Sequence, residues 1–268
     1  MSAHAPGTRA SMIQRLGPWF HNLHLPDGTQ TAPDHRLGDF PSYKWEVLRP
    51  HLPERLDGWT ALDLGCNAGF YSFELARRGA RVTAIDLDEH YLQQARWAAR
   101  EYGLQDAIDF RRMQVYDLAR VEEQFDLVLF MGLFYHLRYP MLGLDLVASR
   151  TRRLLVFQTL TTPGLEVEPE IHDQPLDARE SLTRPGWPRM AFIEHSFAGD
   201  PTNWWVPNHA CVLAMLRSCG LSVSAHLGHE IYLCEPAGAE PEGGPALQRS
   251  AELLAATGRR WQEPAGST

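Results

Sequence analysis

The most informative run in this 268-residue chain is Leu62-Asp63-Leu64-Gly65-Cys66-Asn67-Ala68-Gly69. It lies between an apolar segment typical of a buried strand and a stretch with helical spacing. Gly65 lets a ligand approach the backbone closely, and Gly69 lets the helix and the strand pack while the first helical N–H groups stay free. The run predicts a strand, a ligand-accessible loop and a helix, although a purely structural turn would show the same two glycines.

Strands and helices alternate on both sides of this loop, which is typical of a parallel sheet with helical connections. The segment 125–131 is strongly apolar and should be central. We predict an α/β fold with an open, doubly wound, mostly parallel sheet of seven strands. The predicted strands are Thr60–Leu64, Arg81–Ile85, Ile108–Gln114, Phe125–Met131, Leu154–Gln158, Leu221–Val223 and Glu230–Cys234. The predicted helices are 69–78, 88–103, 140–149, 208–219 and, in the tail, 246–256.

The domain organisation follows from where this alternation begins and ends. Residues 1–58 form an N-terminal extension, 59–236 the sheet domain and 237–268 a peripheral tail rich in Gly, Ala, Pro and Glu. Within the domain, residues 161–207 are too broken by Pro and Gly for a helix bundle and too rich in tryptophan for a linker. We predict that this insertion after the fifth strand is ordered.

Composition excludes several classes of protein. The chain has 25 basic and 33 acidic side chains, a net charge of −8, which argues against a large nucleic-acid surface. No segment has the apolar length of a membrane span, and residues 1–10 lack the core of a signal peptide. Four cysteines without a CxxC pair, and histidines without an HxH or HxxxH pair, give no metal signature. A cytoplasmic protein without a bound metal is expected.

Asp86 strengthens the interpretation of the glycine loop. It ends the second strand, where a carboxylate can accept hydrogen bonds from both hydroxyls of a ribose. Asp86 could instead cap the following helix, but Asp88 is better placed for that. Together the loop and Asp86 favour a doubly wound fold that binds a nucleoside.

Residues 60–160 resemble a class I S-adenosylmethionine-dependent methyltransferase, with the glycine loop, the second-strand acid and the apolar fourth strand in the family's order. The resemblance implies S-adenosylmethionine as cofactor. It departs from the common pattern at Asn67, which replaces a central glycine, and at Gln114, which stands where an acid often contacts adenine. The implied cofactor residues are Asp63 and Gly65 for the methionine end, Asn67 and Gly69 in the loop, Asp86 for the ribose, Gln114 and Val115 for the adenine, and Met131 and Gly132 beside the sulfonium.

A closer resemblance, to the branch that contains the bacterial tRNA wobble-uridine (carboxymethyl)transferases, covers most of the chain. It is carried by Arg15-Leu16-Gly17-Pro18-Trp19, Lys44-Trp45 and Met131-Gly132-Leu133-Phe134-Tyr135-His136. Enzymes of that branch recognise a carboxylated S-adenosylmethionine through a lysine before Gly-Pro, a tyrosine in the fourth-strand motif and a C-terminal arginine. Tyr135 matches, but Leu16 replaces the lysine and the tail offers no counterpart for the arginine. Because leucine cannot neutralise a carboxylate, ordinary S-adenosylmethionine is expected.

Two segments rich in His, Trp and Asn, one in the extension and one in the insertion, are expected to bind the methyl acceptor. Additions before the first strand and after the fifth can fold over the edge of the sheet where ligands bind. A hydrophobic plug under a long loop would have the same composition. The candidate acceptor-binding residues are Trp19, His21, Trp204, Trp205 and Asn208.

Catalysis requires alignment of the acceptor and, for a hydroxyl, removal of its proton. His136 follows the fourth strand at its carboxyl end and is the first candidate base, although it could simply hydrogen-bond the loop; Tyr135 beside it should orient the acceptor. His195 and Glu194 in the insertion are reserve candidates. The expected function is O-methylation of a small organic acceptor, a secondary metabolite or glycan intermediate, with tRNA wobble-uridine (carboxy)methylation as the alternative. A non-catalytic S-adenosylmethionine-binding protein is a third hypothesis, and the sequence leaves a homodimer open.

Overall fold

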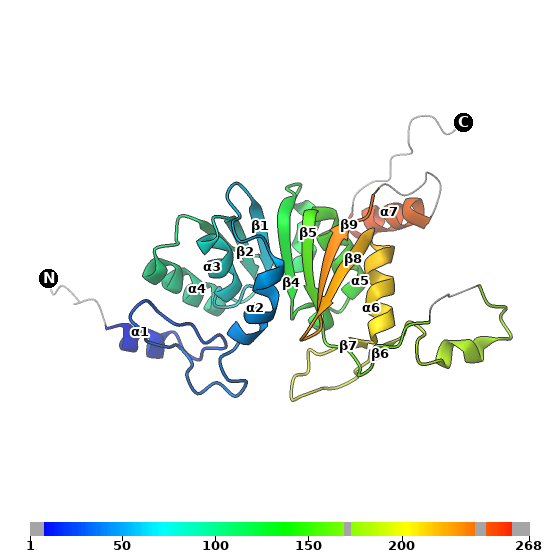
Figure 1. The fold of residues 1–268 in the computed structure, drawn as a ribbon, viewed down its shortest axis with the longest axis horizontal. Helices are drawn as coiled ribbons and strands as arrows, with labels where there is room; N and C mark the ends of the chain where they lie inside the picture. The colour runs from blue at the N-terminus through cyan, green and yellow to red at the C-terminus, as the bar shows by residue number, and fades with distance from the viewer. Residues whose placement is uncertain (1–7, 169–172, 239–244, 259–268) are drawn as a thin grey trace. The chain divides into compact units, whose positions relative to one another are not determined.

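The computed structural model describes residues 8–168, 173–238 and 245–258. It contains the predicted seven-stranded sheet, with strand order β3-β2-β1-β4-β5-β9-β8 and the apolar strand β4 in the middle (Figure 1). The strands of the sheet are β1 (Thr60–Leu64), β2 (Arg81–Asp86), β3 (Ile108–Arg112), β4 (Phe125–Met131), β5 (Thr151–Gln158), β8 (Leu221–Leu227) and β9 (Ile231–Pro236).

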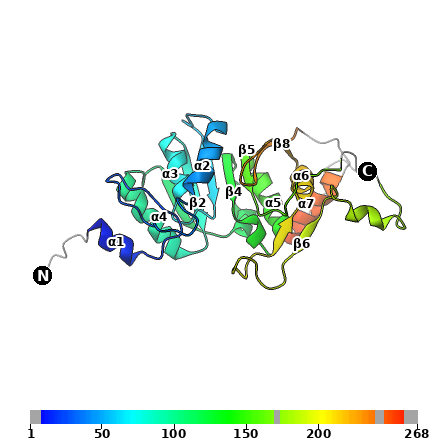
Figure 2. The same ribbon diagram turned by 60° about the horizontal axis from the view of Figure 1, so that its bottom comes forward.

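The chain divides into two compact units, of which the first holds the glycine loop. It comprises the chain up to Gln114 together with residues 125–129 and 227–229. Strands β1, β2 and β3 run parallel in it, and helices α3 (Phe70–Arg77) and α4 (Glu89–Tyr102) pack against them (Figure 2). Helix α4 has the predicted ends, since Asp88 accepts a hydrogen bond from the backbone N–H of His90 and Gly103 ends the helix at a φ of 69°.

The N-terminal extension belongs to the same unit. It contains α1 (Arg9–Arg15), α2 (Ser42–Leu48) and the 3₁₀ helix η1 (Arg49–His51). The Trp19 ring meets that of Trp97 on α4 edge-on, with 5.7 Å between centroids. At the end of α3, the Arg78 guanidinium lies over the Trp45 ring and donates hydrogen bonds to carbonyls of the η1 segment. The extension therefore contacts both α3 and α4.

The second unit comprises residues 115–124, 130–226 and 230 onward. Strands β5 and β9 pair antiparallel, and α5 (Pro140–Arg150) packs against β5 and the 3₁₀ helix η2 (Val115–Arg120). The rings of Phe130, Phe134 and Phe157 contact one another and are fully buried. The remaining helices of the unit are η3 (Phe134–His136), η4 (Arg179–Thr183), α6 (His209–Ser218) and α7 (Pro245–Ala256).

The structure differs from the predicted elements where charged residues interrupt strands. Strand β3, at the edge of the sheet, ends at Arg112 instead of Gln114. The following 3₁₀ helix η2 was not predicted, and its residues Val115 and Leu118 are buried. Strand β5 begins at Thr151, three residues before the predicted start, and includes the exposed Arg152 and Arg153. The prediction thus extended β3 two residues too far and left out the first three residues of β5.

The insertion contains a two-stranded antiparallel sheet, β6 (Met190–Phe192) and β7 (Trp205–Pro207). In it Phe192 pairs with Trp205, and their rings lie 4.9 Å apart. Asn208 then caps α6 by accepting a hydrogen bond from the backbone N–H of Cys211. No helix among the described residues is long and apolar enough to cross a membrane.

Candidate cofactor and acceptor sites

The glycine loop leaves β1 at Leu64 and turns into α3. Gly65 and Cys66 donate backbone hydrogen bonds to the Ile85 carbonyl at 2.9 and 3.0 Å, so the loop is tied to the neighbouring strand β2. Gly65 and Gly69 have φ values of 68° and 88°, and Asn67 has 50°. Asparagine is among the residues that tolerate this left-handed region best. Asn67 can therefore stand where the common motif has glycine.

Gly69 is required for packing. A Cβ atom at this position would lie 2.7 Å from Cζ of Phe73 and 3.3 Å from Cβ of Ala95. A side chain here would force the Phe73 ring or the start of α3 to move. This agrees with the packing role expected of the last glycine in such loops.

Asp86 joins the loop to the next helix. Its carboxylate accepts hydrogen bonds from the backbone N–H of Asn67 at 2.8 Å and of Asp88 at 2.9 Å. Burial raises the pKa of Asp86, and these two amides partly oppose that effect. A carboxylate offers about four lone-pair positions. The amides around Asp86 do not use all of these positions, so the residue fits the hydroxyl donors of a ribose.

Asp63 is buried on β1, with only 2% of its surface exposed. Its carboxylate accepts a hydrogen bond from the Ser72 hydroxyl at 2.6 Å. Burial raises the pKa of Asp63 to about 6, and the charge of Asp86 adds to the effect. None of the described residues forms an ion pair with it. A buried carboxylate without a positive partner fits the ammonium group of an amino-acid ligand.

In the second unit, the motif after β4 brings Gly132 and Tyr135 together. Gly132 has a φ of 67° and donates a backbone hydrogen bond to the Gln158 carbonyl. A Cβ here would lie 3.8 Å from the Tyr135 hydroxyl. Burial raises the pKa of Tyr135 to about 12, so the phenol is neutral and suited to orienting a ligand.

His136 contacts the insertion. Its Nδ1 lies 2.9 Å from Oγ1 of Thr202 and 3.9 Å from Oδ2 of Asp200. Burial lowers the pKa of His136, and the charge of Asp200 partly opposes this. The backbone N–H of Trp204 donates to the Tyr135 carbonyl at 2.8 Å, which fastens the insertion to η3. Sequence reasoning missed Thr202 and Asp200; the Asp-Pro-Thr turn was the available signal.

The other two candidate bases, His195 and Glu194, lie on the surface of the insertion. The side chains of His195 and Glu194 are 85% and 80% exposed, with 3.9 Å between Nε2 and Oε2. The loop that carries them is joined to Trp204 by a hydrogen bond from the Ile193 N–H. Exposure of this degree makes them less suited to holding a proton acceptor in a fixed position.

Of the predicted acceptor-binding residues, Trp19 and His21 belong to the first unit, and Trp204, Trp205 and Asn208 to the second. Trp19 donates its indole N–H to the Ile13 carbonyl, and Asn208 is occupied by hydrogen bonds with Cys211, Arg189 and Trp187. His21 is buried among aromatic rings with Nδ1 unpaired, and burial lowers its pKa to about 3. The rings of Trp204 and Trp205 contact that of Phe192, and the Trp205 indole N–H is buried without a hydrogen-bond partner among the described residues. Acceptor binding by these residues stays a prediction.

The predicted adenine and sulfonium residues lie at the ends of strands or just beyond them. Gln114 is exposed and follows β3, whereas Val115 is buried at the start of η2. Met131, the last residue of β4, is partly exposed. Their contacts with a cofactor also stay predictions.

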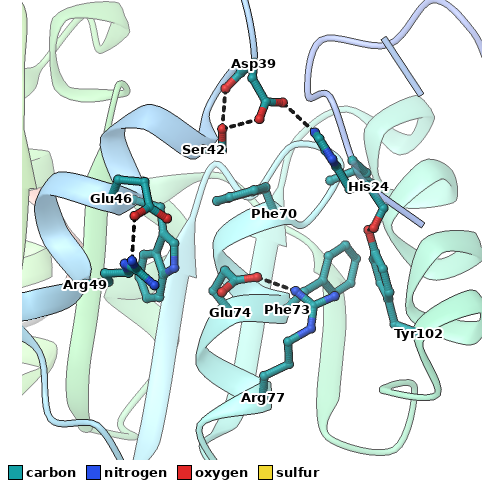
Figure 3. A pocket seen from close by; sticks show the side chains of 12 residues that line it. His24, Asp39, Ser42, Glu46, Arg49, Phe70, Phe73, Glu74, Arg77 and Tyr102 are labelled. Atoms are coloured by element: carbon teal, nitrogen blue, oxygen red, sulfur yellow. Dashed lines mark hydrogen bonds and ion pairs between the residues drawn. The ribbon is translucent and has the colours of Figure 1, made fainter. Parts of the chain in front are cut away.

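A separate pocket of about 260 Å³ lies in the first unit among α2, α3 and α4 (Figure 3). Its charged groups pair with one another: Glu46 with Arg49 at 2.8 Å and Glu74 with Arg77. Neither the glycine loop nor Asp86 lines it, and we assign no ligand to it. The lining residues are Leu23, His24, Asp39, Ser42, Trp45, Glu46, Arg49, Phe70, Phe73, Glu74, Arg77 and Tyr102.

Comparison with known families identifies the class. Residues 61–155 match a family model described as a methyltransferase domain. The sheet, the glycine loop and this match define a class I S-adenosylmethionine-dependent methyltransferase domain, whose cofactor is S-adenosylmethionine. The predicted fold, enzyme class and cofactor are confirmed.

The chain lies near the branch that includes the tRNA U34 carboxymethyltransferases. It is 29% identical over 210 residues to the tRNA U34 carboxymethyltransferase of Cellvibrio japonicus, an alignment that covers 77% of this chain and 55% of that protein. It is also 41% identical over 116 residues to a ubiquinone biosynthesis O-methyltransferase of Hahella chejuensis, covering 40% of this chain and 48% of that protein. The chain thus spans about half the length of these curated relatives.

Solved structures support the fold. The N-terminal domain of EvdMO1, crystallised in the presence of SAH and D-fucose, matches with a TM-score of 0.56 and 20% sequence identity. The match covers 87% of this chain and 98% of that one.

Proposed function

We propose that this chain transfers the methyl group of S-adenosylmethionine to a hydroxyl group of a small organic acceptor, such as a secondary metabolite or glycan intermediate. The cofactor supplies a methyl carbon that its sulfonium has already activated. The protein's task is then to bind both reactants, align them and remove the hydroxyl proton.

The first unit supplies groups suited to the cofactor. The buried, cation-free carboxylate of Asp63 would receive the ammonium group. The lone pairs of Asp86 that the backbone amides leave free would receive the ribose hydroxyls. These contacts are the ones the resemblance implies, and the donor and acceptor chemistry of both side chains supports them.

His136 carries the proposal for hydroxyl chemistry. It follows β4, and ligands of doubly wound folds bind beyond the carboxyl ends of the strands. Its lowered pKa keeps the imidazole neutral near pH 7, so that it can accept a proton. The neutral Tyr135 next to it, with ring centroids 4.3 Å apart, would orient the acceptor.

Leu16 supports ordinary S-adenosylmethionine over its carboxylated form. It directly follows α1, at the position where the tRNA branch has a lysine. The Gln94 side-chain amide donates a hydrogen bond to the Leu16 carbonyl at 2.6 Å. A leucine side chain offers no charge to a second carboxylate. The ubiquinone O-methyltransferase relatives also fit a small acceptor that is methylated at oxygen.

tRNA wobble-uridine modification is the second candidate, because relatives of that name align over more of this chain than the ubiquinone enzymes do. The net charge of −8 and Leu16 oppose it. A non-catalytic S-adenosylmethionine-binding role would require that no acceptor reacts.

Radiolabelled S-adenosylmethionine offered with unmodified tRNA, or with fractionated small-molecule extracts, separates these candidates. We expect label in a small molecule. Label in tRNA would favour the second candidate, and no transfer in either arm would favour the binding role.

A competition experiment tests the cofactor. We expect carboxylated S-adenosylmethionine to bind no better than the ordinary form, and Leu16→Lys to improve its relative affinity. If the carboxylated form wins in the unmodified protein by tenfold or more, about 1.4 kcal/mol, ordinary S-adenosylmethionine is the wrong cofactor.

A further inference from the structure

We infer that Thr202 and Asp200 are positioning residues for His136, and that they keep its Nδ1 protonated so that Nε2 retains the free lone pair of a base. The inference rests on the proposed function, in which His136 accepts the proton of the acceptor hydroxyl. It adds two residues from the insertion that neither the motifs nor the resemblance single out.

The direction of the hydrogen bonds follows from counting protons. Oγ1 of Thr202 lies 2.6 Å from Oδ1 of Asp200. An ionised carboxylate only accepts, so the single hydroxyl proton of Thr202 points to Asp200. The same hydroxyl oxygen is 2.9 Å from Nδ1 of His136, and toward the ring it can only accept. Nδ1 must therefore be the donor.

The second neighbour of Nδ1 imposes the same choice. The backbone carbonyl of Thr202 lies 3.3 Å from Nδ1, and a carbonyl has no proton to donate. If Nδ1 were unprotonated, its lone pair would face two acceptors and make no hydrogen bond. Because a neutral imidazole carries one N–H, protonation at Nδ1 leaves Nε2 as the basic nitrogen.

Asp200 is ionised and close enough to act on the ring directly. Burial works to raise its pKa, but hydrogen bonds from the Thr202 hydroxyl and amide outweigh this and leave the pKa below its usual value. Its Oδ2 lies 3.9 Å from Nδ1. When Nε2 takes a proton, the carboxylate stabilises the imidazolium that forms. The effect is moderate because the Asp200 side chain is 43% exposed.

The loop that carries these residues is held in place on both sides. The N–H of Thr202 donates to Oδ1 of Asp200 at 2.7 Å, which closes a tight turn around Pro201. The side-chain amide of Asn203 donates a hydrogen bond to the Phe197 carbonyl, and the backbone N–H of Trp204 donates one to the Tyr135 carbonyl. Thr202 is therefore fixed relative to the segment that contains His136.

Nuclear magnetic resonance of the full chain with ¹⁵N-labelled histidine tests the tautomer without reference to activity. His136 is assigned among the twelve histidines as the signal lost in His136→Gln. We expect the Nδ1–H tautomer at neutral pH, a smaller fraction of it in Thr202→Val, where only the weaker backbone carbonyl contact at 3.3 Å remains, and the original pattern in Thr202→Ser. An Nε2–H tautomer in the unmodified protein, or no change in Thr202→Val, would overturn the inference.

Measurements of turnover then test whether Nε2 of His136, free in this tautomer, acts as the base. Thr202→Val should lower kcat roughly 10- to 100-fold with the KM for S-adenosylmethionine unchanged, and Thr202→Ser should restore most of it. Asp200→Asn should move the acidic limb of the kcat–pH profile to lower pH, because the imidazolium loses its negative neighbour. Asp109→Asn, the same change of an exposed carboxylate that pairs with Arg111 on β3, is the matched control and should change neither quantity.

The two proposals fail separately. If the tautomer is as expected but His136→Ala keeps full turnover, His136 is not the base, and that part of the proposed function fails. If His136→Ala loses turnover while the tautomer is unaffected by Thr202→Val, only the positioning by Thr202 and Asp200 is wrong.

Discussion

Replacing Gly69 by alanine tests whether the last glycine of the loop serves packing. The residue has a φ of 88°, and an added Cβ would lie 2.7 Å from Cζ of Phe73 and 3.3 Å from Cβ of Ala95. Phe73 is 1% exposed and cannot turn into solvent. The ring or the start of α3 must move.

The expected loss of stability has two parts. A left-handed backbone costs a non-glycine residue roughly 1–2 kcal/mol. Forcing a methyl group into a packed site costs typically 1–3 kcal/mol. Alanine returns about 0.4–1 kcal/mol by restricting the unfolded chain. We therefore expect Gly69→Ala to lower the free energy of unfolding by about 2–4 kcal/mol.

Gly103→Ala is the matched control. Gly103 also has a positive φ, 69°, at the end of α4, but a Cβ there would meet no atom within 4 Å. Only the backbone cost applies, so the loss should be about 1 kcal/mol. Urea denaturation of both variants without cofactor measures the difference. Equal losses in the two variants would refute a packing role for Gly69.

Three further predictions concern ligands and catalysis. Asp86→Ala should weaken binding of S-adenosylmethionine and S-adenosylhomocysteine by about 1.5–3 kcal/mol, the worth of hydrogen bonds to a charged group, with Asp86→Asn losing less; unchanged affinity by calorimetry would remove Asp86 from the site. Because the pKa of Asp63 is about 6 and an ammonium ligand favours its ionised form, cofactor affinity should rise as pH increases toward 6 and level off above it, whereas Asp63→Asn should give a flat profile over that range; a flat profile in the unmodified protein would contradict the ammonium assignment. His136→Ala should bind cofactor normally, lose roughly 10²- to 10⁴-fold in turnover and recover part of it at high pH as the acceptor ionises by itself; near-normal turnover at neutral pH would argue against the base.

The sheet and its first helices could be predicted because their signals are local. Strands β1 and β4 have the predicted bounds, and β2 is one residue longer. The ends of α4 follow from a capping aspartate and a terminal glycine. Each signal lies within a few residues of the feature it specifies. Such features need no knowledge of distant parts of the chain.

The insertion could not be predicted in the same way. Strands β6 and β7 have three residues each and pair across a gap of twelve. Segments this short carry no periodicity, and the pairing depends on aromatic contacts such as that between Phe192 and Trp205. The sequence indicated an ordered, aromatic insertion but not which of its residues meet η3.

The same difference between local and distant contacts explains which residues of the candidate sites the sequence analysis named. The residues proposed to bind the cofactor lie on β1, the glycine loop and β2, and backbone hydrogen bonds between these segments, such as that from Gly65 to the Ile85 carbonyl, fix their positions. The environment of His136 is built instead by side chains 64 and 66 residues later in the chain, Asp200 and Thr202. The glycine loop can therefore stay the same while changes in the insertion alter the surroundings of His136 and the residues proposed to bind the acceptor. In this chain the insertion is accordingly the segment in which substitutions should alter the choice of acceptor without altering cofactor affinity.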